Sequence, residues 1–243
     1  MRTILIKILL GIALVFASGE LAAQRQAETR GKEAANFSWD SQKDQKYSFR
    51  LLSMDGLKRA YYVKVGDVFA PIEASTARSL DTMFFSDTSN IVFYTKRVDG
   101  KDTLFNPVLT VGIGNKEDVV ICLAERDGAL VSNVIDISAK NLPAGVFAVV
   151  NLSNKPFGVA IDKKLLRVEP FGMVKQAFTP NDEIEEVPFK FYILGKKPKL
   201  AFERFFSFAT SQNLTMYVFD VPRNDAMDKE VPFLIRYGKA PRK

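Results

Sequence analysis

Two stretches of this chain carry the same apolar pattern, and the repetition limits the possible folds more than any other feature. The first reads "SNIVFYTKRVDGKDTLFNPVLTVGIGNKEDVVICLAE" and the second "VPFKFYILGKKPKLAFERFFSFATSQNLTMYVFD". At an offset of 95 residues, apolar positions of the first fall on apolar positions of the second. These pairs are Val111 and Phe206, Ile113 and Phe208, Val119 and Leu214, Ile121 and Met216, and Leu123 and Val218. We therefore predict two related units of about ninety residues each.

Both units are predicted to consist of short β-strands. Runs dense in Phe, Tyr, Val and Ile alternate with turn sequences such as "RVDGKD", "GNKED" and "ERDG". Gly, Asp and Asn favour turns because they tolerate left-handed backbone conformations or hydrogen-bond to their own backbone. Alternation of apolar and polar residues predicts sheets with one buried face. We expect an all-β protein of two tandem β-sandwiches, immunoglobulin-like or transthyretin-like.

The ends of these runs predict how the chain is divided. The expected parts are a signal peptide (1–23), a flexible polar leader (24–46), a first β-sandwich (47–137), a linker (138–145), a second β-sandwich (146–238) and a basic tail (239–243).

The N-terminal residues have the layout of a secretory signal peptide. Arg2 and Lys7 flank the start of an apolar run over residues 8–16, which is shorter than the roughly 20 residues of a membrane-spanning helix. We predict cleavage after Ala23, and cleavage after Gly19 is the second choice. The alternative to a cleaved signal peptide is a retained membrane anchor. These features predict export to the periplasm or cell surface of a Gram-negative bacterium, with no membrane span after cleavage.

The absence of histidine excludes more chemistry than any other gap in the composition. Ser-His-Asp and Cys-His catalysis and His-ligated metals all need an imidazole. Cys122 is the only cysteine and lies in the apolar run "DVVICLAE", which predicts a small buried hydrophobe rather than a reactive thiol. We therefore expect no enzymatic activity, no catalytic residue, no cofactor and no metal site.

Two acidic segments leave a calcium site and a hydrolase open as alternatives. Residues 181–186 ("NDEIEE") gather four carboxylates and residues 223–230 ("RNDAMDKE") gather three, and calcium binds six to eight oxygen ligands. Neither segment has the ligand spacing of a known calcium loop, so solvated loops are the preferred interpretation. A pair of acids could also hydrolyse a glycosidic bond, but no motif places one.

One aromatic residue is predicted to point into solvent. In "LAFERFFSFA", alternation puts Phe205 on the same face as the polar residues Glu203 and Ser207. Exposed aromatic side chains often contact partners, so we predict a partner-binding surface at Phe205 and Glu203. Packing of Phe205 against the linker or the other unit is the alternative, and for this residue taken alone it is the preferred interpretation.

The stretch "VVNLSNKPFGVAID" resembles the early hairpin of periplasmic pilus chaperones, which also have two immunoglobulin-like domains. In that family the hairpin belongs to the first domain, whereas here it begins the second, and no binding residue of the family can be assigned to this chain. The wider pattern is similar to uncharacterised exported tandem β-sandwich proteins of Gram-negative bacteria. The resemblance implies two sandwich domains and an exported location.

Together these features predict a non-enzymatic binding or structural module of the bacterial cell envelope. The net charge of +6 favours an anionic envelope polymer as partner, whereas an exposed aromatic favours an envelope protein. No nucleic-acid partner is expected. A chaperone that acts by β-strand augmentation is the first alternative, and a carboxylate-dependent hydrolase is the second.

Overall fold

The computed structural model describes residues 28–34, 36–55, 58–74, 80, 82–179, 184–220 and 233–239. The predicted signal peptide, residues 181–183 of the first acidic segment and all of the second lie outside these residues. No helix in the described part of the chain is long and apolar enough to cross a membrane.

Four β-sheets make up the described structure, and we call them sheets A to D. Their strand orders are β1-β8-β7-β4-β5-β2 (A), β10-β9-β3-β6 (B), β14-β11-β17-β18 (C) and β13-β12-β15-β16 (D). The elements are β1 (Thr29–Arg30), β2 (Lys32–Glu33), the 3-10 helix η1 (Trp39–Gln42), β3 (Tyr47–Ser53), β4 (Arg59–Val65), β5 (Val68–Ala74), β6 (Phe84–Ser86), β7 (Asn90–Asp99), β8 (Asp102–Gly112), β9 (Asp118–Arg126), β10 (Ala129–Asp136), β11 (Val146–Asn151), β12 (Phe157–Ile161), β13 (Lys164–Val168), β14 (Met173–Ala177), β15 (Ile184–Ile193), β16 (Lys199–Ala209), β17 (Leu214–Asp220) and β18 (Phe233–Lys239).

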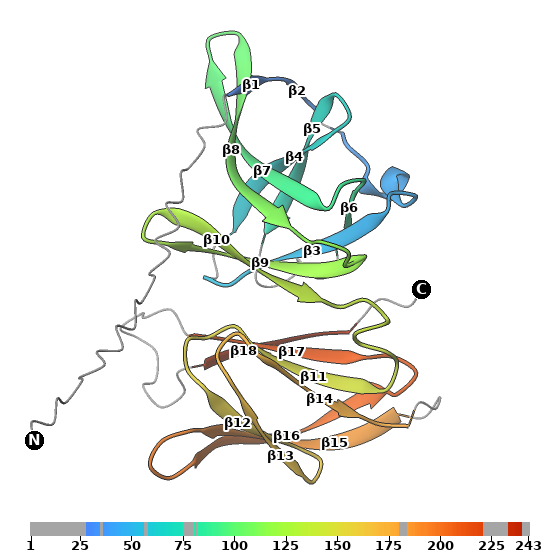
Figure 1. Ribbon diagram of the computed structural model, residues 1–243, viewed down its shortest axis with the longest axis vertical. Helices are drawn as coiled ribbons and strands as arrows, with labels where there is room; N and C mark the ends of the chain where they lie inside the picture. Colours follow the sequence, from blue (N-terminus) through green and yellow to red (C-terminus); the bar gives the residue numbers. More distant parts are fainter. Residues whose placement is uncertain are drawn as a thin grey trace, which may run out of the picture.

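The predicted all-β architecture is confirmed. Sheets A and B use strands up to Asp136, and sheets C and D use strands from Val146 onward. The four sheets follow one another along the long axis of the molecule, with sheet A at one end and sheet D at the other (Figure 1).

Each sheet pair encloses its own apolar core. Between sheets A and B, Phe49, Phe93 and Ile121 are completely buried. Between sheets C and D, Phe189 and Met216 are equally buried. Side chains alternate along each strand, so one face of every sheet supplies its core.

The same strand pairing recurs in both units. Strand β3 pairs in parallel with β9, with Phe49 opposite Val119. Strand β11 pairs in parallel with β17, with Phe147 opposite Leu214. Val119 and Leu214 are partners in the 95-residue repeat read from the sequence, so the two halves use the repeated residues at the same place in the sheet.

A β-bulge at the same place in both long hairpins changes the face to which the side chains point. In the β7–β8 hairpin the pairing shifts between Phe93 and Tyr94, and in the β15–β16 hairpin between Phe191 and Tyr192. A bulge puts two residues opposite one, so the alternation reverses beyond it. Leu200, opposite Tyr192, therefore lies on the side of sheet D away from the core.

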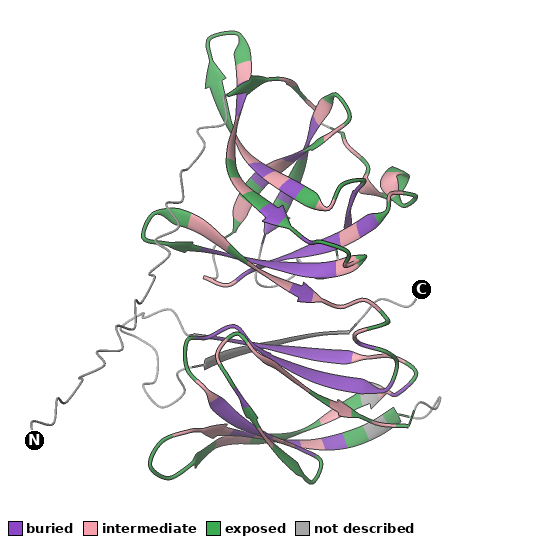
Figure 2. Cartoon of the chain, in the orientation of Figure 1, coloured by how far each residue is buried: buried purple, intermediate pink, exposed green. Residues whose placement is uncertain are grey.

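A third apolar cluster joins the two sheet pairs, and we call it the seam. It consists of Leu52, Val120, Cys122, Ile135, Val150, Leu152, Tyr217 and Phe219. Sheets B and C meet here, and their central strands are coloured as buried (Figure 2). All six residues of β11 and residues 119–124 of β9 are buried. One face of each strand lines a core, and the other contributes to the seam or, for Val146 and Ala148, to a small neighbouring cluster with Leu142.

The rim of the seam adds contacts between the units. The guanidinium of Arg126, beside the β9–β10 turn, lies 5.6 Å from the ring centre of Phe171 in the turn before β14. Phe171 has a φ of +57°, which is unusual for a bulky side chain. Within sheet B, Arg50 is almost fully buried and donates to Asp118 of β9 at 2.8 Å. An extensive apolar interface favours one fixed orientation of two domains over free relative motion.

The predicted flexible leader is wrong for the described part of residues 24–46. Strand β1 pairs with β8 and β2 pairs with β5, so one short segment joins the two edges of sheet A (Figure 1). The ring of Trp39 packs on the first core, and its indole N–H donates to the carbonyl of Pro71 at 3.2 Å. Glu33 accepts hydrogen bonds from Tyr62 and Lys96. This polar segment is held because its few apolar and charged side chains find partners on sheet A.

Candidate functional site

The outward side of sheet D carries the residues that the sequence analysis selected. Phe189 and Phe191 of β15 point into the second core, so their neighbours in the strand point away from it. We call this outward side the distal face. Its residues are Gly158 and Ala160 of β12, Leu165 and Arg167 of β13, Ile184, Glu186, Pro188, Lys190 and Tyr192 of β15, and Leu200, Glu203, Phe205 and Ser207 of β16.

Exposed apolar side chains gather on the distal face. Phe205 is 66% exposed, Ile184 70%, Leu165 69% and Leu200 45%. Seven large apolar side chains are exposed among the described residues, and these four all lie on this one face. Single exposed apolar residues are ordinary, but a group on one surface is typical of an interaction site.

Three of the four charged residues on the distal face form ion pairs, and the fourth, Glu186, lies opposite Ser207. Lys190 of β15 lies directly across from Glu203 of β16, and Lys190 Nζ is 3.0 Å from Glu203 Oε1. Its hydrogen bond to Glu203 raises the pKa of Lys190. Arg167 of β13 donates to Glu169 at 2.5 Å. These pairs leave the centre of the face nearly neutral, with Pro188 beside Phe205 in the next strand.

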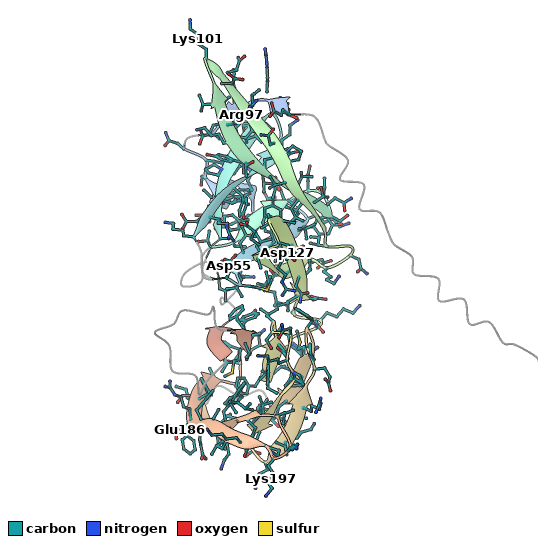
Figure 3. All side chains as sticks on the ribbon, turned by 90° about the vertical axis from the view of Figure 1, so that its left-hand side faces the viewer. Asp55, Arg97, Lys101, Asp127, Glu186 and Lys197 are labelled. Carbon is teal, nitrogen blue, oxygen red and sulfur yellow. The ribbon has the colours of Figure 1, made fainter. Side chains whose placement is uncertain are left out.

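The structure places Phe205 and Glu203 next to each other in the outermost strand of the sheet, as the alternation predicted. Phe205 is mostly exposed, and Glu203 pairs with Lys190. The alternative that Phe205 packs against the linker or the other unit is wrong, because sheet C separates sheet D from the first sheet pair (Figure 1). Glu186, also on the distal face, lies at the end of the molecule opposite Lys101 (Figure 3). A role for Phe205 and Glu203 in partner binding stays a prediction.

Sequence reasoning missed three further members of the apolar group: Leu165, Ile184 and Leu200. Leu165 precedes Leu166, and nothing in "KLLRV" tells which leucine faces outward. Leu200 has the same spacing from Phe202 as core residues do, and only the bulge turns it outward. Ile184 lies within the acidic segment 181–186. Only the structure shows that β15 begins at this residue and that its side chain is exposed.

The single cysteine is buried, as predicted, but in an unexpected place. Cys122 is fully buried in the seam, in contact with side chains of both units. Burial raises the pKa of the Cys122 thiol and that of the Tyr217 hydroxyl in the same cluster. A thiol in this environment is mostly protonated and inaccessible, which does not suit a nucleophile.

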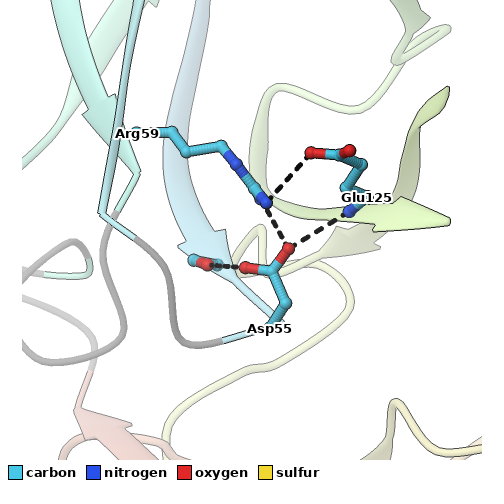
Figure 4. Close-up of polar contacts among 4 residues, drawn as sticks. Asp55, Arg59 and Glu125 are labelled. Carbon is cyan, nitrogen blue, oxygen red and sulfur yellow. Dashed lines mark hydrogen bonds and ion pairs between the residues drawn. The ribbon is translucent and has the colours of Figure 1, made fainter. Parts of the chain in front are cut away.

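A pair of carboxylates lies at the rim of sheet B, but an arginine joins them (Figure 4). Arg59 Nη1 donates to Asp55 at 2.5 Å, and Nη2 donates to Glu125 at 3.2 Å. Asp55 also accepts from the Ser53 hydroxyl at 2.8 Å and from the backbone N–H of Glu125 at 3.2 Å. This cluster ties β4 to β9, which favours a structural role over the acid pair of a hydrolase.

In the second unit, neutral residues form the hydrogen bonds of the corresponding turn. Asn151 takes the place of Ser53 at the end of the equivalent strand, opposite Val218 as Ser53 is opposite Leu123. The Asn151 side chain accepts from the Ser153 hydroxyl at 2.7 Å, which reverses the direction of the bond in the first unit, where Ser53 donates to Asp55. The "NLSNKP" motif is thus accounted for by the turn it forms.

Metal ligands do not gather anywhere in the described part of the chain, where no group of three Asp, Glu or Cys side chains could hold an ion. Residues 181–183 and 223–230, which contain most of the carboxylates considered for calcium, lie outside the described residues.

Comparison of the sequence with protein-family models and with curated proteins gave no match. The resemblance to exported tandem β-sandwich proteins therefore stays a prediction that rests on the sequence motif and composition.

Proposed function

We propose that this protein is a non-enzymatic, exported binding module of the bacterial cell envelope, which docks an envelope protein on the distal face. The observation that carries the proposal is the gathering of Phe205, Leu200, Leu165 and Ile184 on one solvent-facing sheet. Burying an exposed aromatic and its aliphatic neighbours gives a protein partner both area and a central anchor.

The charge distribution on this face favours a protein over an anionic polymer. A polymer of phosphates or carboxylates would need a row of free cations, whereas Lys190 is paired with Glu203 and Arg167 with Glu169. The net positive charge of the chain arises from residues spread over the whole sequence.

The seam supports a scaffold that presents its binding face rigidly. Sheets B and C bury an apolar cluster between the units, which disfavours a hinge between them. The distal face lies at the end of the molecule away from the N-terminal unit (Figure 1). A partner docked there would be held at a fixed distance from whatever contacts sheet A.

A chaperone or assembly factor that acts by β-strand augmentation is the second candidate. Strand β16 forms one edge of sheet D and could accept a client strand. A carboxylate-dependent hydrolase is the least favoured candidate, because Arg59 bridges Asp55 and Glu125.

The test is a pull-down from envelope extract with residues 24–243 as bait. Phe205→Ala removes the aromatic anchor, and Val98→Ala is the matched control because Val98 is 64% exposed on the β7–β8 hairpin of the other unit. We expect one envelope protein to be retained in high salt, lost with Phe205→Ala and kept with Val98→Ala. Capture that ignores Phe205→Ala, or capture only of polymer in low salt, would contradict the proposal.

A further inference from the structure

Strand β16 is an unusually long edge strand. It spans eleven residues, and among the described residues β15 is the only strand paired with it. An open edge presents a row of backbone N–H and C=O groups that can pair with another strand. Phe205, at 66% exposure, lies in the middle of this edge.

The other edges with described side chains are protected by length or composition. Strands β1 and β2 have two residues each and β6 has three. The five-residue edges β13 and β14 carry Lys164, Arg167 and Lys175. Strand β10 has eight residues, none of which is an exposed large apolar side chain. Short strands and cationic side chains are the usual means of blocking edge-to-edge pairing. Strand β16 carries the cations Lys199 and Arg204, but it is longer than the other edges and has no proline, and its exposed Phe205 is a large apolar side chain.

The sequence of β16 favours one two-fold pairing with itself. Two antiparallel copies related by a two-fold axis perpendicular to the sheet keep their inner and outer faces aligned, so only some registers are allowed. A register centred on Glu203 would place two carboxylates opposite each other, and one centred on Arg204 would place two guanidinium groups opposite each other. Like charges directly opposite destabilise a strand pair.

Registers centred on Phe205, Phe206 or Ser207 avoid both clashes, but only the one centred on Phe205 pairs two mostly exposed aromatic rings. Phe205 then lies opposite Phe205 of the second copy, and aromatic cross-strand pairs stabilise antiparallel sheets. Glu203 lies opposite Ser207, and Arg204 opposite the partly buried Phe206, where a guanidinium can stack on an aromatic ring. The bulge at Leu200 and Ala201 lies outside the central paired stretch.

We propose that the edge of sheet D is a homodimer interface, in which β16 pairs antiparallel with β16 of a second copy about a two-fold axis at Phe205. Sheet D becomes a continuous eight-stranded sheet, and the two distal faces become one surface. The proposal goes beyond partner docking, since a monomer could also dock a partner on this face.

Disulfide trapping tests the register, because the only native cysteine is buried. Residues directly opposite in an antiparallel pair have Cα atoms about 4.5–5.5 Å apart, within the range of a disulfide. Phe205→Cys is expected to form a covalent dimer under mild oxidation. Glu203→Cys is the matched control, because its copy lies four residues away along the strand, about 13 Å, and no cross-link is expected.

A charge pair at Ser207 tests the same register without a cysteine. Ser207→Glu places a carboxylate opposite Glu203 of the second copy, and Ser207→Lys places an ammonium there. Ser207 and Glu203 are exposed, but Ser207 also lies opposite Glu186 of its own β15, so the free energy of unfolding of each variant is measured to separate this contact from dimerisation. We expect sedimentation equilibrium to give a dimer for the wild type, about ten-fold weaker dimerisation for Ser207→Glu and tighter dimerisation for Ser207→Lys.

Three results would overturn the proposal. A wild-type protein that stays monomeric over the accessible concentration range excludes the dimer. Equal cross-linking of Phe205→Cys and Glu203→Cys excludes the register, and dimerisation that is the same in both Ser207 variants places the interface elsewhere. A monomer that still captures an envelope protein through Phe205 would refute the dimer and leave the proposed docking function in place.

Discussion

At the scale of single residues, a few positions are fixed by close approach rather than by polarity. Gly31 joins β1 to β2 above the rings of Phe69 and Phe105, which are stacked with centroids 3.8 Å apart. A Cβ atom on Gly31 would lie 2.3 Å from a ring carbon of Phe69. Because Phe69 is buried and held by Phe105, the ring has no room to move aside.

Gly31→Ala is therefore expected to lower the free energy of unfolding by about 1–3 kcal/mol through overpacking. The measurement is urea unfolding followed by fluorescence of Trp39, which packs on the same unit. Gly195→Ala is the control, since its Cβ would meet nothing closer than 3.9 Å. Equal stability of the two variants would mean that β1 and β2 do not hold the position described here.

At the scale of elements, alternation and turn residues predicted where strands lie. They did not predict, beyond a bulge, which side chains face the core and which face solvent. The runs "DVVICLAE" and "LAFERFFSFA" coincide closely with β9 and β16, because Phe, Tyr, Val and Ile favour strands and Gly, Asp and Asn favour the turns between them. The bulges at Tyr94 and Tyr192 could not be read from the sequence, since an extra residue in a strand leaves no marker of its own. Leu200 was missed for this reason.

The turn after β11 depends on one buried amide. Asn151 is completely buried, donates to the carbonyls of Lys155 and Val168, and accepts from the backbone and hydroxyl of Ser153. Asn151→Ala leaves these groups without their partner, and we expect a loss of about 3 kcal/mol in the free energy of unfolding.

Ser53→Ala is the comparison for this prediction, because it removes only the hydroxyl that donates to Asp55 in the equivalent turn. We expect a loss of about 1 kcal/mol. Chemical denaturation of both variants measures the difference. Similar losses would show that the two turns are stabilised in the same way and that the buried amide has no special role.

At the scale of the whole molecule, the seam determines how the two units are arranged. Continuous apolar runs such as "DVVICLAE" and "VFAVVN" indicate strands buried on both faces. The sequence analysis interpreted the first run only as the location of a buried thiol. The second layer that covers it, sheet C, comes from a different part of the chain and could not be named in advance.

Opening of the seam is measurable through Cys122. Phe219 lies in the seam at 2% exposure, and its truncation to Ala removes a large side chain between the units. We expect Phe219→Ala to increase the labelling rate of Cys122 by a thiol reagent under native conditions. Val98→Ala, an exposed substitution in the first unit, is expected to leave the rate unchanged. Labelling as slow in Phe219→Ala as in the wild type would mean that the seam does not control access to the thiol.

The sequence by itself determined that the protein is all-β, where most of its strands lie, that Cys122 is buried and that Phe205 faces solvent. These properties depend on local alternation and turn chemistry, which neighbouring residues specify. Tertiary structure decided the seam, the docking of Trp39 and β1–β2 on sheet A, and the placing of Leu165, Ile184 and Leu200 on the same sheet face as Phe205. Those features depend on which distant strands become neighbours, and the period of a single strand carries no information about its partner.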